Sequence, residues 1–510
     1  MATSSTNKRI AKNTIMLYIR MLVTTILSLY TVRLTLQILG ADDYGIYNSI
    51  CGVIGFLSFI SATLANSAQR YLAYDLGQHN TERYGKTFSL LLSVFVILAI
   101  IIVLIAEAIG PWLISNKLVI PVSRITAAHW IFQLSVLSIL VRFITLPYTA
   151  SIVAYEKMGI YAYVSIIEVV LKLAIVYALI VSPYDKLIFY AALHFAMDCI
   201  ISAIYIFICK KKIPSCKFNF YWEKSRAKEI GTFIGWNTFG SLSGVVEIQG
   251  MTIVTNMFFP PAIVASRAIA DRINSVSYSF VTNFVLATSP QMVKYFSIRD
   301  NNNFNLLFYR TSLISYYLML LISVPLVLLM PDMLSLWLGD SLLDDMVIFS
   351  RLSLLSALVS SLETPISRAV SATGQVKVYE LTNCLVAFSG IPIIVVLFHI
   401  GCPAYYGYIV YMVILAISII YRIIILQKYS TITIKDYCYT CLLRVVSSTV
   451  IMGFVCYIMS KIVIDHILVR ILALGVLSLI ITMIVIFLSL RQNEKSYIID
   501  IVRKKVKNKE

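Results

Sequence analysis

Long runs of hydrophobic residues, separated by short polar breaks, extend along almost the whole 510-residue chain. A helix that spans a bilayer needs roughly 20 mostly apolar residues, and about fourteen runs have that length. They cover residues 13–38, 46–68, 87–109, 125–150, 160–182, 186–209, 230–259, 275–291, 304–330, 346–371, 381–400, 405–426, 441–460 and 467–490. The pattern therefore predicts an all-α polytopic membrane protein with about 14 transmembrane helices and no separate soluble domain.

The composition supports this prediction. Hydrophobic residues make up 59% of the chain and charged residues 13%, which leaves too few polar residues to cover a soluble globule. The first run is too long for the core of a signal peptide and lacks a small-residue cleavage site, so we expect the mature protein to begin near Met1. Cys438 and Cys441 form a CxxC pattern. Without a second pair or a nearby His, packing is favoured over a metal or redox role.

One long polar break divides the runs into two sets. Residues 210–229 read KKKIPSCKFNFYWEKSRAKE and carry seven Lys and Arg against two Glu. The two sides resemble each other at an offset of about 220 residues. An A-x-S-x-Q pattern at 65–69 recurs at 287–291, and Pro111 has a counterpart in Pro331. Each half has six predicted helices, an even number, so the two copies have the same orientation in the membrane. Parallel repeats of this kind occur in transporters whose substrate site lies between the two halves.

The repeat predicts five segments along the chain. They are an N-terminal six-helix lobe (1–209), a basic cytoplasmic linker (210–229), a C-terminal six-helix lobe (230–426), an appended pair of helices 13 and 14 (441–490) and a basic cytoplasmic tail (491–510).

The distribution of Lys and Arg predicts which side of the membrane each break faces. With both termini inside, the cytoplasmic segments hold 26 Lys and Arg, and the external ones, counted with Lys186 at the boundary of its run, hold six. Positive residues favour the cytoplasmic side of short loops, so both termini are predicted to be cytoplasmic. The net charge is +17, but its spread over short loops speaks against a nucleic-acid partner.

Charged residues inside the predicted spans are the main candidates for function. The basic ones are Arg20, Arg33, Arg142, Lys172, Arg310, Arg351, Arg368, Arg422, Arg444 and Arg470, and the acidic ones are Glu107, Glu168, Asp198, Glu247 and Glu363. A charge near the bilayer centre costs roughly 2.5–3.5 kcal/mol on insertion scales. The surplus of cations therefore predicts contact with water or with an anionic partner.

Position within the spans separates these cations. Arg310, Arg368, Arg422, Arg444 and Arg470 lie near predicted helix ends, where a long side chain can extend to the membrane surface. Lys172 is central in its span and follows Glu168 by four residues, the order that favours an ion pair on a helix. A self-neutralising structural pair and a functional pair are equally compatible with this spacing. Together with Arg33 and Arg142, Lys172 is predicted to form a positive path for an anionic headgroup.

Polar residues are concentrated in a few of the spans. The spans 46–68 and 275–291, at corresponding positions of the two halves, and the glycine-rich span 230–259 are rich in Ser, Thr, Asn and Gly. Small residues at such spacing also permit close helix packing. Polar helices at matching positions of two repeats nevertheless point to a translocation cleft. We expect 13–38, 46–68, 230–259 and 275–291 to line it.

No nucleotide-binding or hydrolase motif is found in the sequence, and the five His lie apart, which disfavours a metal site. Energy is then expected from an ion gradient or from the supply and consumption of substrate. The candidate substrate-binding residues are Arg20, Arg33, Arg142, Lys172 and Arg310, and the candidate ion-coupling residues are Glu168, Asp198, Glu247 and Glu363.

Four stretches, at 31–50, 64–78, 153–173 and 266–296, together resemble the polysaccharide transporter (Wzx) branch of the multidrug/oligosaccharidyl-lipid/polysaccharide (MOP) exporter superfamily. The resemblance implies two MATE-like six-helix lobes in a V shape around a cationic cavity. It implies a flippase, not an enzyme, that moves undecaprenyl-pyrophosphate-linked oligosaccharide, a unit of O-antigen, capsule or exopolysaccharide, to the outer leaflet of the bacterial inner membrane. No cofactor is implied, H⁺ or Na⁺ is the candidate coupling ion, and the expected partners are this lipid-linked oligosaccharide, membrane lipids, a polysaccharide polymerase and a chain-length regulator.

Three alternatives remain. A lipid II flippase has the same architecture. A drug or cation exporter of the superfamily is expected to centre on acidic residues, whereas basic residues predominate in these spans. A membrane-bound polysaccharide polymerase or ligase is expected to carry a large external loop with Arg or His, and the predicted external breaks are short.

Overall fold

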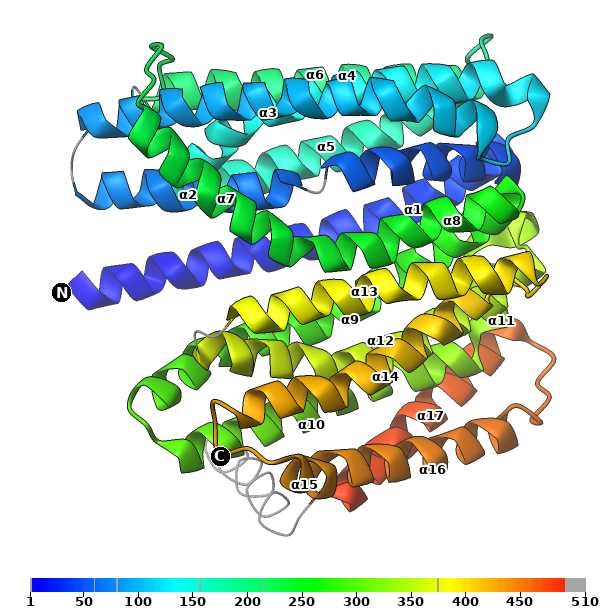
Figure 1. Cartoon of the computed structure of the whole chain (residues 1–510). Helices are drawn as coiled ribbons and strands as arrows, with labels where there is room; N and C mark the ends of the chain where they lie inside the picture. Colours follow the sequence, from blue (N-terminus) through cyan, green and yellow to red (C-terminus); the bar gives the residue numbers. More distant parts are fainter. Residues whose placement is uncertain are drawn as a thin grey trace. The chain divides into compact units, whose positions relative to one another are not determined.

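The computed structural model describes residues 2–58, 60–78, 81–155, 157–213, 215–373 and 376–490, and these ranges are built from helices (Figure 1). The helices are α1 (Ala2–Ser58), α2 (Ile60–Gly77), α3 (Thr81–Asn116), α4 (Ile125–Ala154), α5 (Met158–Ile180), α6 (Lys186–Lys212), α7 (Lys224–Val245), α8 (Met251–Phe258), α9 (Pro261–Ser297), α10 (Asn301–Leu328), α11 (Met330–Leu338), α12 (Asp344–Thr373), α13 (Val376–His399), α14 (Tyr406–Gln427), α15 (Ile434–Tyr437), α16 (Leu443–Met459) and α17 (Ile467–Ser489). π-Helical turns follow α7 at Val246–Gly250 and α15 at Cys438–Leu442. The predicted all-α class is confirmed.

Within the described residues, eleven helices are long and apolar enough to cross a membrane. Helices α7 and α9, which contain most of the polar spans 230–259 and 275–291, are not among them. Parts of both helices lie outside the residues whose side chains the structure describes. The number of fourteen spans therefore stays a prediction.

The break predicted between the first two spans is a kink inside α1. Two helical segments meet within the sequence GADDYG, where Gly40, with φ 81° and ψ 168°, leaves the helical conformation. A positive φ is readily adopted by glycine because it has no Cβ. Residues 13–38 and the start of 46–68 therefore lie in two helical segments separated at Gly40, inside the predicted break.

The chain forms two compact units, which we describe separately. The first unit comprises Met1–Ala268 and Asn383–Ala404, and the second comprises Ile269–Thr382 and Tyr405–Glu510. The span 230–259 and most of the span 381–400 thus lie in the first unit, although both were assigned to the C-terminal lobe by the repeat. The boundaries of the predicted lobes remain a prediction.

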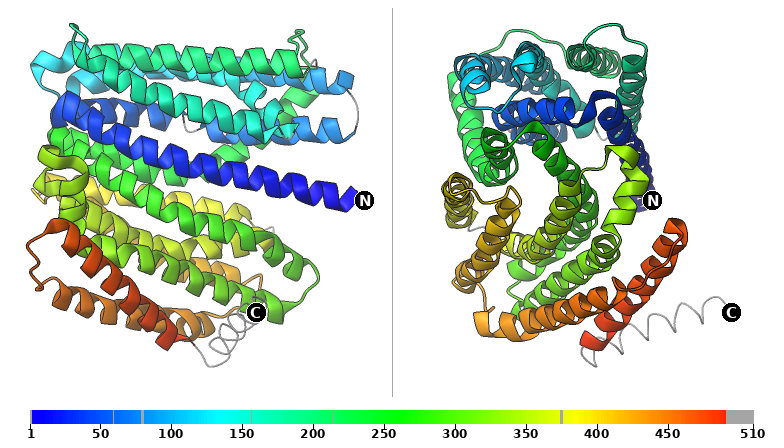
Figure 2. Two further views of the ribbon diagram at one scale, coloured as in Figure 1. Left: turned by 180° about the vertical axis from the view of Figure 1, so that it is seen from behind. Right: turned by 90° about the vertical axis from the view of Figure 1, so that its right-hand side faces the viewer.

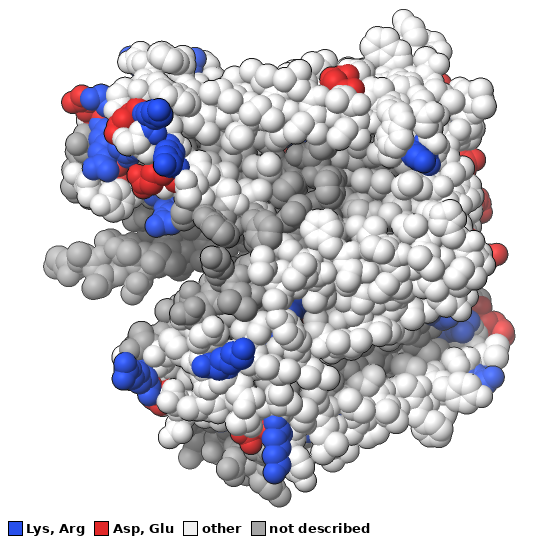
Figure 3. Space-filling view, in the orientation of Figure 1, with Lys and Arg blue, Asp and Glu red and all other residues white. Residues whose placement is uncertain are grey.

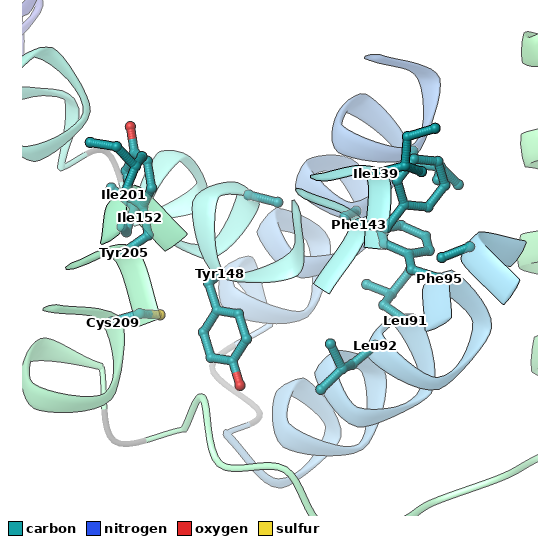
Figure 4. Close-up of a cluster of buried hydrophobic side chains, with 14 of the residues drawn as sticks. Leu91, Leu92, Phe95, Ile139, Phe143, Tyr148, Ile152, Ile201, Tyr205 and Cys209 are labelled. Carbon is teal, nitrogen blue, oxygen red and sulfur yellow. The ribbon is translucent and has the colours of Figure 1, made fainter. Parts of the chain in front are cut away.

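The core of the first unit lies where α3, α4 and α6 pack together (Figure 1). Figure 4 shows Leu91 and Phe95 of α3 near Phe143 of α4, with Tyr205 of α6 in the same cluster. In lipid, such contacts hold helices together by close packing and by hydrogen bonds rather than by expulsion of water. One such hydrogen bond is donated across the α4–α6 interface by Thr145 Oγ1 to Ser202 Oγ, at 2.7 Å.

Close helix packing through glycine occurs at only part of the predicted span 230–259. Cβ atoms added to Gly231, Gly235 and Gly244 of α7 would meet nothing within 4 Å. A Cβ at Gly45 of α1, in contrast, would overlap the backbone carbonyl of Pro261. The glycines that permit a close approach therefore include Gly45 in α1 and also Gly250, whose added Cβ would lie 2.9 Å from Ile391 Cδ1, whereas the expectation of close packing is not met at the three positions in α7.

Ion pairs connect the polar segments between helices at each end of the first unit. At one end Arg124 binds Asp43, with Nη2 and Oδ2 2.8 Å apart, and Asp185, with Nη1 and Oδ2 2.5 Å apart. These three residues lie in or next to breaks that were all predicted to be external. Breaks assigned to one side thus meet at one end of the unit, and the side of the membrane that each end faces stays a prediction.

At the other end the linker is held by a second group, which we call the Asp75 cluster: Asp75 of α2, Arg83 and Thr87 of α3, and Arg226 of α7. Asp75 is 0% exposed and accepts hydrogen bonds from Arg226 Nη2 at 3.0 and 3.2 Å and from Thr87 Oγ1 at 2.5 Å. The Nε atom of Arg83 lies 3.0 Å from its Oδ1. On the face of the first unit seen in Figure 3, charged residues gather at one end of the helices.

In the second unit, the appended helices α16 and α17 pack against α10 (Figure 2). Leu328, at the end of α10, clusters with Met459 of α16 and Leu474 of α17. Ser489 Oγ donates a hydrogen bond to Tyr317 Oη at 2.7 Å. The pair is therefore an integral part of this unit.

Candidate functional site

Four helices of the first unit bring polar side chains together inside the predicted membrane region. Tyr190, His194 and Asp198 are spaced by four residues and so share one face of α6. Helix α6 contacts α4, which carries Arg142, and α5, and α5 in turn contacts α1. We call the group of Arg142, Glu168, Lys172, His194 and Asp198 the His194 cluster.

Arg142 and Asp198 form a two-pronged ion pair between α4 and α6. Arg142 Nε donates to Asp198 Oδ2 at 3.2 Å and Nη2 donates to Oδ1 at 3.1 Å. The side chain of Arg142 is 61% exposed, whereas that of Asp198 is 12% exposed. Paired guanidinium–carboxylate bonds are strong and directional, so Asp198 orients an arginine whose remaining N–H groups are open to a ligand.

Lys172 and Glu168 form the pair that their spacing predicts on α5. Lys172 Nζ lies 2.6 Å from Glu168 Oε1, and the two side chains are 33% and 34% exposed. The contact is compatible with both the structural and the functional interpretation.

His194 is close to residues of both ion pairs. Its ring makes an edge contact with Tyr190, with centroids 4.5 Å apart, and a tilted contact with Tyr47 of α1 at 6.0 Å. Arg142, Lys172 and Glu168 are all near enough to act on it electrostatically. Its Nε2 atom is buried and has no hydrogen-bond partner among the described residues. From the sequence alone, His194 was regarded as an isolated histidine. Its spacing of four residues from Asp198 could have indicated that the two side chains share one face of a helix.

The remaining candidates are Arg20, Arg33, Arg310, Glu247 and Glu363. The side chains of Arg20 and Glu247 lie outside the described part of the chain. Arg33 is half-buried on α1 of the first unit, and Arg310 is half-buried on α10 of the second unit; each makes an interaction. Glu363 of α12 belongs to the second unit, where it pairs with Arg422 of α14.

Arg422 corrects one expectation. Its side chain was predicted to extend to the membrane surface, but the residue is only 5% exposed and its guanidinium faces Glu363. This prediction was wrong because a carboxylate on a neighbouring helix offers a closer countercharge than the surface does. Arg470 likewise has an acidic neighbour, with its Nε atom 3.5 Å from Asp332 Oδ2.

The geometry of the His194 cluster is compatible with binding of an anion at Arg142. Its two cations each face one carboxylate, so their charges are compensated, which lowers the cost of placing them in a membrane. An anionic ligand at the exposed side of Arg142 would compete with Asp198 for the guanidinium. At Arg142 and Lys172, the predicted positive path therefore consists of cations whose charges are compensated by neighbouring carboxylates.

The comparisons with known proteins identify the fold. No protein-family model and no curated protein sequence matches the chain. A solved structure described as the lipid II flippase MurJ in an inward closed conformation has a TM-score of 0.71 at 16% identity, and the match covers 92% of this chain and 98% of that one. An inward-facing multidrug resistance MATE transporter of the MOP superfamily has a TM-score of 0.64 at 11% identity, covering 81% and 98%.

A third structure is a MOP superfamily transporter from Pyrococcus furiosus, described by a reversed polarity of its binding pocket. Its TM-score is 0.59 at 13% identity, and the match covers 82% of this chain and 97% of that one. The chain is thus a multi-pass membrane protein with the fold shared by MATE and MurJ transporters. The predicted MATE-like fold is confirmed, and the polysaccharide transporter branch stays a prediction.

Proposed function

We propose that this protein is a flippase that moves an undecaprenyl-pyrophosphate-linked oligosaccharide from the inner to the outer leaflet of the bacterial inner membrane by alternating access. The observation that carries the proposal is the exposure of positive side chains deep inside predicted spans. The side chain of Arg142, past the middle of α4, is 61% exposed, and that of Lys172, in the centre of its span, is 33% exposed. A pyrophosphate group is the kind of anion that such side chains bind.

The geometry suggests how substrate binding and ion coupling are linked. A pyrophosphate that binds Arg142 would replace Asp198 as its partner, because guanidinium groups bind phosphate oxygens in the same two-pronged way. Asp198, only 12% exposed, would then lack its countercharge and would gain affinity for a proton or a sodium ion. Substrate and coupling ion would thus occupy the cluster together.

The comparisons favour a lipid-linked substrate over a drug. The MurJ structure, whose name assigns it lipid II, matches 92% of this chain, and the first MATE structure matches 81%. The longer match to a structure named for a lipid-linked substrate supports a lipid-linked substrate for this chain.

The experiment is a deletion of the coding sequence, followed by identification of the lipid-linked saccharide that accumulates on the inner leaflet. We expect an undecaprenyl-pyrophosphate-linked oligosaccharide to build up and surface glycan to fall. Wild type should restore export, whereas Arg142→Ala should reach normal levels in the membrane without restoring it. Arg368→Ala, a change of an exposed arginine near the end of α12, is the matched control and should restore export.

Other outcomes would refute the proposal in distinct ways. Accumulation of lipid II with loss of viability would identify a lipid II flippase. Unchanged lipid-linked saccharides with altered drug resistance would identify an exporter. Full export by Arg142→Ala would show that this arginine does not handle the substrate.

A further inference from the structure

An apolar groove lies on the first unit where the linker crosses α3 and α4. It has a volume of about 620 Å³ and is lined by four residues of α3 between Leu92 and Ile97, by Ile144 of α4, and by Phe218, Phe220 and Trp222 of the linker. The volume falls within the range of about 300–1,000 Å³ that is usual for ligand pockets. No part of the His194 cluster lines it.

Every second residue of the linker places an aromatic side chain in the groove. Phe218, Phe220 and Trp222 are two residues apart and 48%, 78% and 47% exposed, as on one face of an extended segment. Between them, the backbone N–H of Asn219 donates to Ser89 Oγ on α3 at 3.1 Å. Tyr221 packs against the core of the unit. The aromatic wall is therefore anchored to α3 and faces outward.

The groove suits a hydrocarbon chain. The polar side-chain groups of its lining are the hydroxyl of Ser93, which donates to the carbonyl of Ser89 at 3.0 Å, and the indole N–H of Trp222. The other lining side chains are apolar. The part of the groove on α3 lies inside the span predicted to start at residue 87.

Positive charges lie at the end of the groove nearest the linker. Lys86 precedes Leu92 by six residues, which is about 9 Å along a helix. Its ammonium pairs with Glu82 Oε1 at 2.7 Å and lies 5.6 Å from the ring centre of Tyr221, and its side chain is 47% exposed, so an anionic headgroup would compete with Glu82 for it. Lys217 and Lys224, which flank the aromatic run, are also exposed. A hydrocarbon site next to exposed lysines is complementary to a lipid with an anionic headgroup.

We propose that this linker groove binds an anionic phospholipid of the adjacent leaflet, with one acyl chain between α3, α4 and the linker aromatics and the phosphate headgroup at Lys86 and Lys217. The bound lipid fastens the linker to the first unit at the membrane surface. This site is separate from the one proposed for the transported substrate.

Native mass spectrometry of the full-length protein tests the proposal with two added lipids that have the same acyl chains, phosphatidylglycerol and phosphatidylcholine. We expect phosphatidylglycerol to bind about five-fold more tightly, which corresponds to about 1 kcal/mol. Ile97→Trp fills the groove and should weaken phosphatidylglycerol binding by at least about five-fold. Ile109→Trp is the matched control, because both isoleucines are on α3 and are 46% and 50% exposed, and it should bind like wild type.

Two further variants separate the parts of the site. Lys217→Gln should abolish the preference for phosphatidylglycerol while phosphatidylcholine binding stays unchanged. Phe220→Ala, outside the helices, should weaken binding of both lipids even if Ile97→Trp does not fold.

Three results would overturn the proposal. The first is that wild type, Ile97→Trp and Phe220→Ala bind phosphatidylglycerol equally well. The second is that wild type binds phosphatidylglycerol and phosphatidylcholine with equal affinity. The third is that a polyprenyl phosphate displaces phosphatidylglycerol from the groove at lower concentration. The last result would assign the groove to the tail of the transported substrate.

Discussion

Replacing Asp75 tests whether a buried carboxylate holds the linker to the first unit. Asp75 is 0% exposed, its partner Arg226 has a side chain that is 15% exposed, and Arg83 has one that is 42% exposed. Removing one partner of a buried ion pair typically costs about 3–5 kcal/mol, because the other charge stays buried without compensation. Asp75→Asn should therefore destabilise the protein by about this amount, mostly through Arg226.

The two arginines should differ because their exposure differs. Arg226→Gln removes charge-assisted hydrogen bonds of 3.0 and 3.2 Å, which are worth about 1.5–3 kcal/mol, and leaves Asp75 with Arg83 and Thr87. Arg83→Gln removes a partner that water already screens, so its cost should be about 0–1 kcal/mol. The change Asp75→Asn in the Arg226→Gln background should cost less than in wild type, since the two residues interact directly.

The assay combines two measurements on the full-length protein. Thermal denaturation in detergent should rank the midpoints as Asp75→Asn lowest, then Arg226→Gln, then Arg83→Gln. Trypsin added to inverted membrane vesicles should cut the linker fastest in Asp75→Asn. Glu82→Gln is the control, because Glu82 pairs with Lys86 at 2.7 Å but its side chain is 79% exposed. If Arg83→Gln were as damaging as Arg226→Gln, or if Asp75→Asn melted like wild type, the assigned role of burial would be refuted.

Three further predictions concern other parts of the chain. The double change of Glu168→Gln with Lys172→Gln should leave the amount of protein in the membrane normal, because both side chains are about one-third exposed. It should still abolish export. Restored export, measured on a surface-glycan gel, would show that the pair is purely structural. Gly45→Ala should lower the melting temperature, since overpacking costs about 1–3 kcal/mol. Gly235→Ala, whose added Cβ meets open space, should raise the melting temperature slightly, because alanine stabilises a helix by about 0.5–1 kcal/mol relative to glycine. Equal shifts of the melting temperature would contradict the packing at Gly45. A cysteine at Ser215 in a Cys-free background should react with an impermeant thiol reagent in inverted vesicles and not in whole cells, and labelling of whole cells would refute the predicted topology.

Much of the local structure followed from the sequence. The apolar runs predicted the helices because a bilayer admits only segments that satisfy their own backbone hydrogen bonds. The contact between Glu168 and Lys172 was also visible, because residues four apart face each other on any helix. The recurrence of polar and apolar features at an offset of about 220 residues suggested a transporter fold, and the likeness to MurJ and MATE structures confirmed that fold.

The contacts between helices were decided by the tertiary structure alone. Arg142 and Asp198 are 56 residues apart, and Arg226 and Asp75 are 151 apart. Nothing in the spacing along one helix predicts which face of another helix will meet it. In a soluble protein the apolar stripe would mark the inner face, but in lipid the outer face is apolar too, so hydrophobic periodicity loses this information. The sequence therefore determined which charges enter the membrane, and the packing of α4, α5 and α6 determined that those of the His194 cluster meet.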